Sequence, residues 1–381
     1  MTFWYTVGAN RCILSKTSSL FAQCRVFGVR DMGKSRLFLG YETAFWIWRK
    51  AGPQAFSALA QSRVTSLAGG APTAEKIRSF RAKHPDLATD VVHVIVRGGD
   101  RRDLPGVKTY ARITPLPERS FYLLDDDVYV ASPELCLMQL ASKLSEQEVL
   151  KLALEMCGTY AIDPHYDPEG GSFYDSPDDE EQDDSPGTCK RPPLTNARKL
   201  KAYSERLLKP GSRARRAHFL RYVVDSSASP RETALYMLLC MPPRFGGYGL
   251  AIPELNRRID FTLRDRLMIG ADHFDCDLYW PKQVAVEYDS KRHHTAEEKQ
   301  ERDAIRRNML QYKGIRVITA TRLQVNSAHQ FDKLARQIGR AVGKRFRIPE
   351  KEHVEARVRL RKTLFEWDVL SSWSAESDID G

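Results

Sequence analysis

Hydrophobic and polar residues alternate with a period of two in two neighbouring stretches, 273–280 (HFDCDLYW) and 284–289 (VAVEYD). This period predicts half-buried β-strands, and the intervening 281–283 (PKQ) predicts the turn of a hairpin. Other elements are predicted around the hairpin: a helix that begins at 229–232, a helix over 295–314 and a strand over 315–319. The order helix, hairpin, helix, strand is typical of a compact α/β core with a mixed sheet.

The first 162 residues contain both the helical pattern of apolar residues and the pattern of β-strands. Residues 42–50 (ETAFWIWRK) are apolar on a helical period, whereas 90–97 (DVVHVIVR) is rich in β-branched residues and ends at a Gly-Gly turn. Further along we predict a strand over 128–130 and helices that begin at Ser132 and Ser145. The sequence therefore predicts an N-terminal mixed α/β domain over residues 1–162.

An acidic segment follows. Residues 163–184 contain ten acidic side chains and no Lys or Arg. Because like charges at this density repel one another, we predict a disordered linker over 163–190. A second interpretation is that the segment mimics DNA and occupies a basic groove of its own protein. The linker would separate the N-terminal domain from a second domain over 191–350, which precedes a C-terminal extension and tail over 351–381.

Net charge points towards polyanions. The chain of 381 residues is 42% hydrophobic and carries a net charge of +10. Without the ten acidic residues of the linker the balance is 59 basic against 39 acidic, or +20. Nucleic acid is the usual partner of such a surface, although a merely soluble basic protein also fits. Arg213, Arg215 and Arg216 lie in a basic segment that either contacts phosphates or forms a solvated helix face.

Cysteine usage and hydropathy narrow the class of protein. None of the seven cysteines forms a C-x-x-C pair, so the sequence suggests neither a zinc ribbon nor a thioredoxin-like site. No uncharged apolar run reaches the length of a membrane span, and the first residues lack the core of a signal peptide. We therefore expect a cytoplasmic protein with reduced thiols and no membrane partner.

The predicted hairpin crowds carboxylates together. If 281–283 is the loop, Trp280 faces Val284, and counting inward places Asp277 opposite Glu287 and Asp275 opposite Asp289. Carboxylates this close relieve their repulsion by sharing a proton or a cation. Oxygen ligands of this kind suit Mg²⁺.

Simpler interpretations exist. The hairpin can be exposed with an acidic face, and Lys291 and Arg292 can form ordinary ion pairs with it. A loop shorter by one residue would place Asp277 and Glu287 on opposite faces. Glu232, three residues after Ser229, is interpreted as part of a capping box at the start of its helix.

Several motifs together carry a family resemblance. They are 277–281 (DLYWP), 284–294 (VAVEYDSKRHH), Asp303 with Arg306 and Arg307, 314–317 (GIRV), and the Ser-Pro-x-Glu of 229–232. They resemble the domain-of-unknown-function 559 family, which is related to very short patch repair endonucleases within the PD-(D/E)XK nuclease superfamily. The resemblance covers roughly residues 225–345.

The resemblance implies a restriction-endonuclease-like core, a mixed sheet flanked by helices, and hydrolysis of DNA phosphodiester bonds with Mg²⁺ or Mn²⁺. Asp277 and Glu287 would hold the ion, helped by the backbone carbonyl that follows Glu287. The superfamily often has a Lys two residues after the Glu, where this chain has Asp289, and Lys291 would replace it. His293 or His294 would assist the attacking water, as would Asp289.

The resemblance also bears on partners. Arg306 and Arg307 would contact DNA, and Arg306 or Lys291 would offset charge in the transition state. Residues 127–138 distantly resemble abortive-infection antitoxin regulators of the AbiEi type, which implies an N-terminal module that binds DNA or a protein partner. Two functions follow: a DNA endonuclease of repair or phage defence, or a non-catalytic, antitoxin-like transcriptional regulator on an inactive nuclease fold. A pure interaction scaffold would explain the charge but not the carboxylates.

Overall fold

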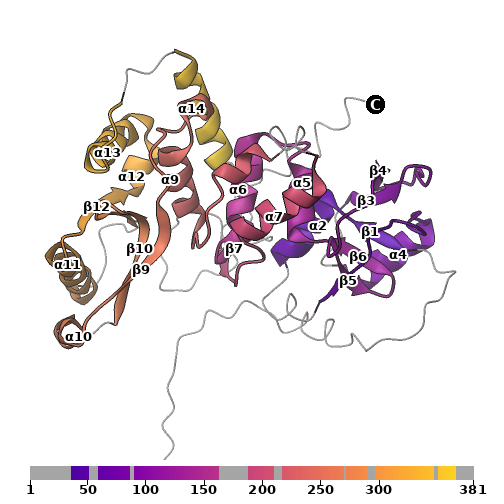
Figure 1. Ribbon diagram of the computed structural model, residues 1–381, viewed down its shortest axis with the longest axis horizontal. Helices are drawn as coiled ribbons and strands as arrows, with labels where there is room; N and C mark the ends of the chain where they lie inside the picture. Colours follow the sequence, from indigo (N-terminus) through magenta and orange to yellow (C-terminus); the bar gives the residue numbers. More distant parts are fainter. Residues whose placement is uncertain are drawn as a thin grey trace, which may run out of the picture. The chain divides into compact units, whose positions relative to one another are not determined.

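The computed structural model describes residues 36–50, 59–85, 90–162, 188–209, 217–269, 272–289, 297–346 and 351–365. The chain divides into two compact units, Met1–Cys136 and Leu137–Gly381 (Figure 1). Each unit combines helices with a sheet of its own, so the predicted mixed α/β class is confirmed. Within the described residues, every helix is too short or too polar to span a membrane.

The N-terminal unit is built on a six-stranded mixed sheet with the order β2-β5-β6-β1-β3-β4. Its strands are β1 (Leu37–Leu39), β2 (Ala60–Ser62), β3 (Val92–Arg97), β4 (Val107–Arg112), β5 (Phe121–Asp125) and β6 (Val128–Ala131). Its helices are α2 (Tyr41–Lys50) and α4 (Ala74–Lys83), and α5 (Pro133–Leu140) spans the point of division. The helix predicted at 42–50 and the strands predicted at 90–97 and 128–130 are confirmed.

Large aromatic side chains make up much of the core of this unit. Phe38 and Phe121 are fully buried, and their rings contact each other in a tilted arrangement with centroids 4.9 Å apart. Trp48 of α2 is equally buried, and its indole N–H donates to the backbone oxygen of Ala131 at 2.7 Å. That bond satisfies the one polar atom of a large apolar side chain, as burial requires.

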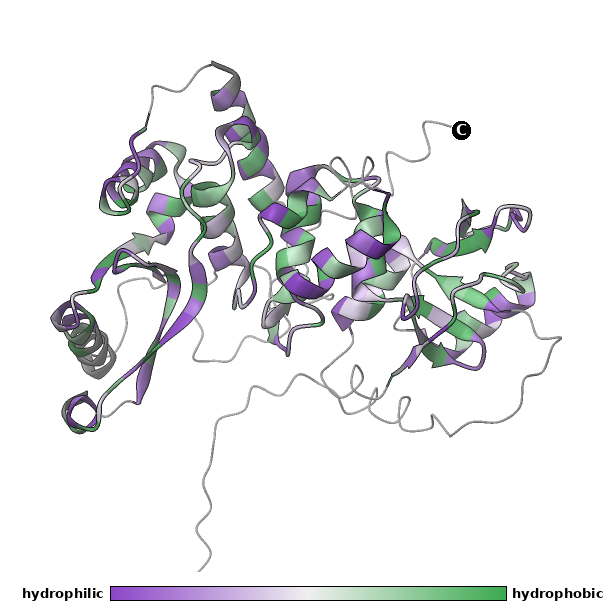
Figure 2. Cartoon of the chain, in the orientation of Figure 1, coloured by the Kyte–Doolittle hydropathy of each residue, from purple (hydrophilic) through white to green (hydrophobic). Residues whose placement is uncertain are grey.

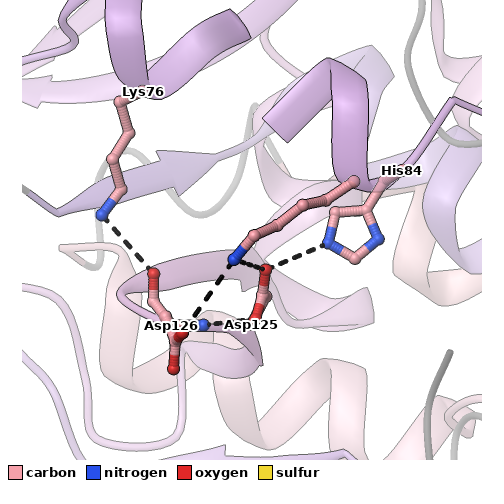
Figure 3. A network of polar contacts seen from close by, with 5 residues as sticks. Lys76, His84, Asp125 and Asp126 are labelled. Carbon is pink, nitrogen blue, oxygen red and sulfur yellow. Dashed lines mark hydrogen bonds and ion pairs between the residues drawn. The ribbon is translucent and has the colours of Figure 1, made fainter. Parts of the chain in front are cut away.

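A polar network joins the end of α4 to the turn between β5 and β6 (Figure 3). Lys83 Nζ lies 2.9 Å from the carboxylate of Asp125, and His84 Nε2 lies 3.5 Å from it. Burial alone would raise the pKa of Asp125, but the hydrogen bond from Lys83 and the charges of Lys83 and His84 hold it below its ordinary value. The network fixes the helix on the hairpin, and Lys76 adds a contact to the backbone oxygen of Asp126.

His93 of β3 is a second buried polar group, 5% exposed. Its backbone N–H donates to the hydroxyl of Thr43 at 2.9 Å, and its Nδ1 lies 3.3 Å from the same hydroxyl. Burial, together with the charge of Lys108, lowers the pKa of His93 to about 4. The imidazole is therefore neutral in the folded protein at neutral pH.

We expect His93 to make the folded protein sensitive to acid. The ordinary pKa of histidine, 6.5, applies to the unfolded chain, which takes up a proton before the folded chain does. The free energy of unfolding contributed by this group is complete above pH 6.5 and is lost as pH falls towards 4. Urea unfolding between pH 4 and 7 should show a weaker pH dependence in a His93→Gln variant. Equal slopes for the two proteins would contradict this account.

The C-terminal unit contains a four-stranded sheet with the order β12-β11-β10-β9. The strands are β9 (Glu254–Asp260), β10 (His273–Trp280), β11 (Val284–Asp289) and β12 (Arg316–Thr321). Around them lie α9 (Pro230–Cys240), α10 (Leu263–Ile269), α11 (Glu297–Tyr312), α12 (Arg322–Asn326), α13 (Ala328–Ala341) and α14 (Lys351–Phe365). In Figure 2, hydrophilic and hydrophobic residues both occur along the paired strands β9 and β10, and the alternation was predicted for β10.

The predicted hairpin is confirmed, with its register over the three residue pairs next to the turn. Trp280 pairs with Val284, Tyr279 with Ala285 and Leu278 with Val286. Gln283 adopts a left-handed conformation, with φ of 58°, that closes the three-residue turn. Trp280 is buried, and its indole N–H donates to the backbone oxygen of Ala251 at 2.7 Å. β11 and β12 are parallel, and α11 makes the crossover between them.

The division between the units differs from the one expected. α6 (Glu146–Cys157) and β7 (Tyr160–Ile162), which the sequence assigned to the N-terminal domain, belong to the C-terminal unit. α6 packs on α9 and α14, and Lys151 Nζ donates to the backbone oxygen of Thr363 at 2.8 Å. A break in composition marks the acidic segment, but long-range packing decides which elements share a core.

The end of the predicted linker is also corrected, and the predicted extension gains a described helix. The last residues of the predicted linker form β8 (Thr188–Lys190), which pairs with β7, whereas residues 163–187 lie outside the described residues. The predicted extension from residue 351 contains α14, whose Leu360 and Leu364 are buried. β8 and α14 are thus held by contacts with residues that are distant in the sequence, which the local composition does not indicate. Another helix of this unit is α7 (Ala197–Leu207). It exposes Lys and Arg side chains, as the basic segment predicts.

Candidate functional site

The two central strands of the C-terminal sheet separate at Asp277 and Glu287. β10 and β11 pair only as far as Leu278 and Val286. Beyond that point β10 continues along β9, with Cys276 opposite Arg257, and β11 continues along β12. Asp277 and Glu287 therefore stand where the ladder opens into a fork, at the first residues of the two strands that are released from their mutual pairing.

Each carboxylate of the fork accepts a hydrogen bond from the other strand. Asp277 Oδ2 accepts the backbone N–H of Tyr288 at 2.7 Å. The Glu287 carboxylate accepts the backbone N–H of Asp277 and the thiol of Cys276, and both bonds lower the pKa of Glu287. The side chains thus replace the ladder bonds lost at the fork, and this exchange holds both carboxylates in place.

The predicted patch of four carboxylates is wrong in its outer pair. Asp275 pairs with Arg258 on β9, and its half-exposed carboxylate lies 3.4 Å from His273 Nε2. Asp289 pairs with Thr321 on β12. The ladder between β10 and β11 ends at Leu278 and Val286, so Asp275 and Asp289 do not form the predicted cross-strand pair.

A third carboxylate comes from the start of α9. Glu232 is 8% exposed, and its charge raises the pKa of both Asp277 and Glu287. Its Oε1 accepts the hydroxyl of Ser229 at 3.0 Å, and its Oε2 accepts the Nδ2 of Asn256 at 2.6 Å. The Ser229 cap is confirmed, because its hydroxyl accepts the backbone N–H of Glu232 at 3.1 Å. The sequence pattern predicts only the capping role of Glu232 and does not indicate that this side chain lies beside the fork.

Burial and mutual repulsion dominate the electrostatics of this cluster. The pKa of Glu287 is raised to about 9, first by burial and then by the charges of Asp277 and Glu232. The pKa of Asp277 is raised to about 7, by burial and by Glu232. Burial raises the pKa of Glu232 as well. Among the described residues no Lys or Arg forms an ion pair with these three, so a proton or a cation is needed to balance them.

One acceptor in the cluster lacks a hydrogen bond. Oε1 of Glu287 is buried and has no hydrogen-bond partner, whereas most buried polar atoms have one. A carboxylate oxygen in that position accepts a cation or carries a proton. The orphaned atom and the raised pKa of the same side chain therefore point to the same requirement.

The donor set fits a hard divalent cation with few protein ligands. In the described part of the chain, no group of three or more His, Cys, Asp or Glu has the arrangement of a metal site. The fork instead presents two carboxylates, Asp277 and Glu287, while Glu232 is occupied by its own donors. Mg²⁺ commonly takes one or two carboxylates and completes its shell with water and carbonyl oxygens.

The other predicted site residues are not brought into this cluster. Asp289 is half-buried on β11, and Arg307 is exposed on α11. Several predicted residues lie outside the described residues: Lys291, His293, His294, Arg213, Arg215 and Arg216. The side chain of Arg306 also lies outside them. The described site consequently contains Asp277 and Glu287 from the prediction and adds Glu232 and Cys276.

Comparisons with protein-family models, with curated proteins and with solved structures find no match to this chain.

Proposed function

We propose that the chain is a metal-dependent DNA endonuclease that hydrolyses phosphodiester bonds. The observation that carries the proposal is the buried, uncompensated carboxylate pair at the fork, with Oε1 of Glu287 lacking any hydrogen bond. Raised carboxyl pKa values that arise from burial and a like charge are typical of functional sites. The resemblance of residues 277–294 to PD-(D/E)XK nucleases supports the same reading.

Asp277 and Glu287 are the residues that would hold Mg²⁺ or Mn²⁺. When bound, such an ion supplies Lewis-acid chemistry, polarising a phosphoryl oxygen and lowering the pKa of water at the site. The backbone N–H groups of Tyr288 and Asp277 orient the two carboxylates. Glu232 adds negative charge from α9, which strengthens the attraction of the cluster for a cation.

Proton transfer is assigned to residues just beyond the fork. Asp289 is half-buried on the same strand as Glu287 and is the proposed acceptor of a proton from water. His293, His294 and Lys291 remain proposals from the family resemblance, as do the DNA contacts of Arg213, Arg215, Arg216, Arg306 and Arg307. The proposed setting is DNA repair or phage defence in the cytoplasm, and the N-terminal unit is the proposed module for DNA or a protein partner.

One observation favours a second function. Asp289 stands where the superfamily often has Lys, and three donors already occupy Glu232, so the described site lacks a full set of catalytic groups. A nuclease-like core of this kind would serve a non-catalytic, antitoxin-like regulator that binds DNA. This alternative predicts salt-dependent DNA binding without cleavage.

One plasmid-cleavage assay distinguishes the nuclease from the non-catalytic regulator. Supercoiled plasmid is incubated with the full-length protein in Mg²⁺, in Mn²⁺ and in EDTA. The nuclease proposal predicts nicked or linear plasmid with either ion and none in EDTA. Binding of the plasmid in all three conditions without any cleavage would reject the nuclease and leave the regulator.

A further inference from the structure

A cluster of five exposed cations lies at the end of the C-terminal sheet opposite the fork: Lys282, Arg316, Arg340, Lys344 and Arg345. Lys282 belongs to the turn between β10 and β11, and the neighbouring Gln283 accepts the backbone N–H of Arg316 at 2.7 Å. Lys282 Nζ lies against Gly343, which directly precedes Lys344. The hairpin turn, the start of β12 and the end of α13 thus bring these residues to the same end of the sheet, and they are here named the turn-end cluster.

The backbone that carries the cluster is fixed. α13 ends in a left-handed glycine, Gly343 with φ of 78°, and the backbone N–H of Lys344 donates to Gly339 at 2.7 Å. The ring of Phe346 packs on Gly339, where an added Cβ would lie 2.1 Å from Phe346 Cε2. The same ring meets Tyr248 edge-on, with centroids 5.8 Å apart. Lys344 and Arg345 are therefore held in a tight turn.

The charge of the cluster is not neutralised within the described residues. None of its five members forms an ion pair there. The one acidic side chain of α13, Asp332, is occupied by Tyr248 at 2.9 Å, Arg336 at 2.7 Å and Arg357 at 3.3 Å. Five uncompensated cations on a fixed surface suit a polyanion.

A simpler role has to be weighed against this one. Basic side chains at the end of a helix stabilise it through the helix dipole, by about 0.3–1 kcal/mol each. That role accounts for Arg340, Lys344 and Arg345 but not for Lys282 and Arg316, which come from a hairpin turn and from the start of β12. Convergence from separate elements favours a binding surface.

We propose that the turn-end cluster binds the sugar-phosphate backbone of DNA on its approach to the fork. The inference rests on the proposed function for the identity of the polyanion. Val284 and Glu287 are three residues apart on β11, or about 10 Å along a strand. That length corresponds to about three base-pair steps of duplex, so one DNA molecule spans the cluster and the carboxylates.

The test measures binding separately from cleavage. Anisotropy of a fluorescein-labelled duplex is recorded in EDTA across a range of salt concentrations, with the full-length chain. The variant is Arg340→Gln/Lys344→Gln/Arg345→Gln. Its matched control is Arg264→Gln/Lys333→Gln/Arg359→Gln, which removes three exposed cations of the C-terminal unit that lie outside the cluster. We expect the cluster variant to bind about 10- to 100-fold more weakly at 0.1 M salt, with a salt slope shallower by about 2–3.

Each outcome decides the matter. An equal loss in the control variant would show that only overall charge matters and would overturn the proposal. A lowered melting temperature with unchanged affinity would assign the cluster to the helix dipole alone. Tighter binding of single-stranded RNA that depends on the same three residues would replace DNA as the partner. Failure of plasmid cleavage with this binding difference intact would reject the nuclease but keep the surface.

Discussion

Replacing Glu287 by Gln is expected to lower the rate of Mg²⁺-dependent DNA cleavage by at least about 10³-fold, because a lost metal ligand removes several kcal/mol of transition-state stabilisation. The substitution keeps the shape of the side chain and its hydrogen bond from the backbone N–H of Asp277. It replaces the carboxylate, whose Oε1 atom has no hydrogen-bond partner, by a neutral amide. Single-turnover cleavage of a labelled duplex, followed over a range of Mg²⁺ concentrations, measures the effect.

Asp275→Asn is the matched control for this variant. Asp275 lies two residues from Asp277 on β10, but it pairs with Arg258 of β9 and its half-exposed carboxylate lies 3.4 Å from His273 Nε2. We expect its cleavage rate to stay within about 3-fold of the wild type, since exposed ion pairs contribute little. A wild-type rate for Glu287→Gln, or an equal loss for Asp275→Asn, would contradict the assignment of the site to the fork.

The second large effect concerns stability. We expect Asp277→Asn to raise the free energy of unfolding at pH 8 by about 2 kcal/mol, because it removes a charge that is buried and that is repelled by Glu232. An increase of that size raises the melting temperature of a domain of this length by several degrees, at about 2–4 °C per kcal/mol. A variant that is more stable and less active is typical of a site strained for function.

The pH dependence of the free energy of unfolding follows from the direction in which folding shifts the pKa of Asp277. The pKa of Asp277 rises from 3.8 in the unfolded chain to about 7 in the folded chain, so the folded protein holds the proton more tightly. The stabilising contribution of this proton is complete below pH 3.8 and is lost as pH rises to about 7. For Glu287 the loss continues to about pH 9. The advantage of Asp277→Asn should therefore grow as the pH is raised.

Urea unfolding of the two proteins at pH 5, 7 and 9 measures that advantage directly. The same experiment with Mg²⁺ adds a second signature, because a ligand that binds only the folded state stabilises it. Mg²⁺ should raise the stability of the wild type and leave Asp277→Asn nearly unchanged. A variant that is less stable than the wild type at every pH would show that Asp277 serves the fold and not the site.

Local patterns predicted the hairpin well. Alternation in 273–280 and 284–289 specifies two strands, and a loop of three residues fixes which side chains face each other next to the turn. The fork could not be predicted in this way. Alternation continues through both strands, and only tertiary packing determines that the β10–β11 ladder ends at Leu278 and Val286 while β10 stays paired with β9 and β11 with β12.

Glu232 illustrates the same limit. Its neighbours in sequence, Ser229 and Pro230, specify a helix start, and that interpretation is confirmed. Asp277 lies far along the chain, and nothing in the local pattern of α9 indicates that the cap faces the fork. The Ser-Pro-x-Glu match to the family resemblance was the one available signal for a wider role. The assignment of α6 to the C-terminal unit depends likewise on distant contacts with α9 and α14.

Calorimetric titration of Mg²⁺ into the full-length protein tests the central claim most directly, namely that the carboxylates of the fork form a cation site. Wild type, Glu287→Gln and the Asp275→Asn control are titrated at pH 8 under identical conditions. We expect one site in the wild type and in Asp275→Asn, and loss of that binding heat in Glu287→Gln. Identical isotherms for all three proteins, or no binding by the wild type, would contradict the account.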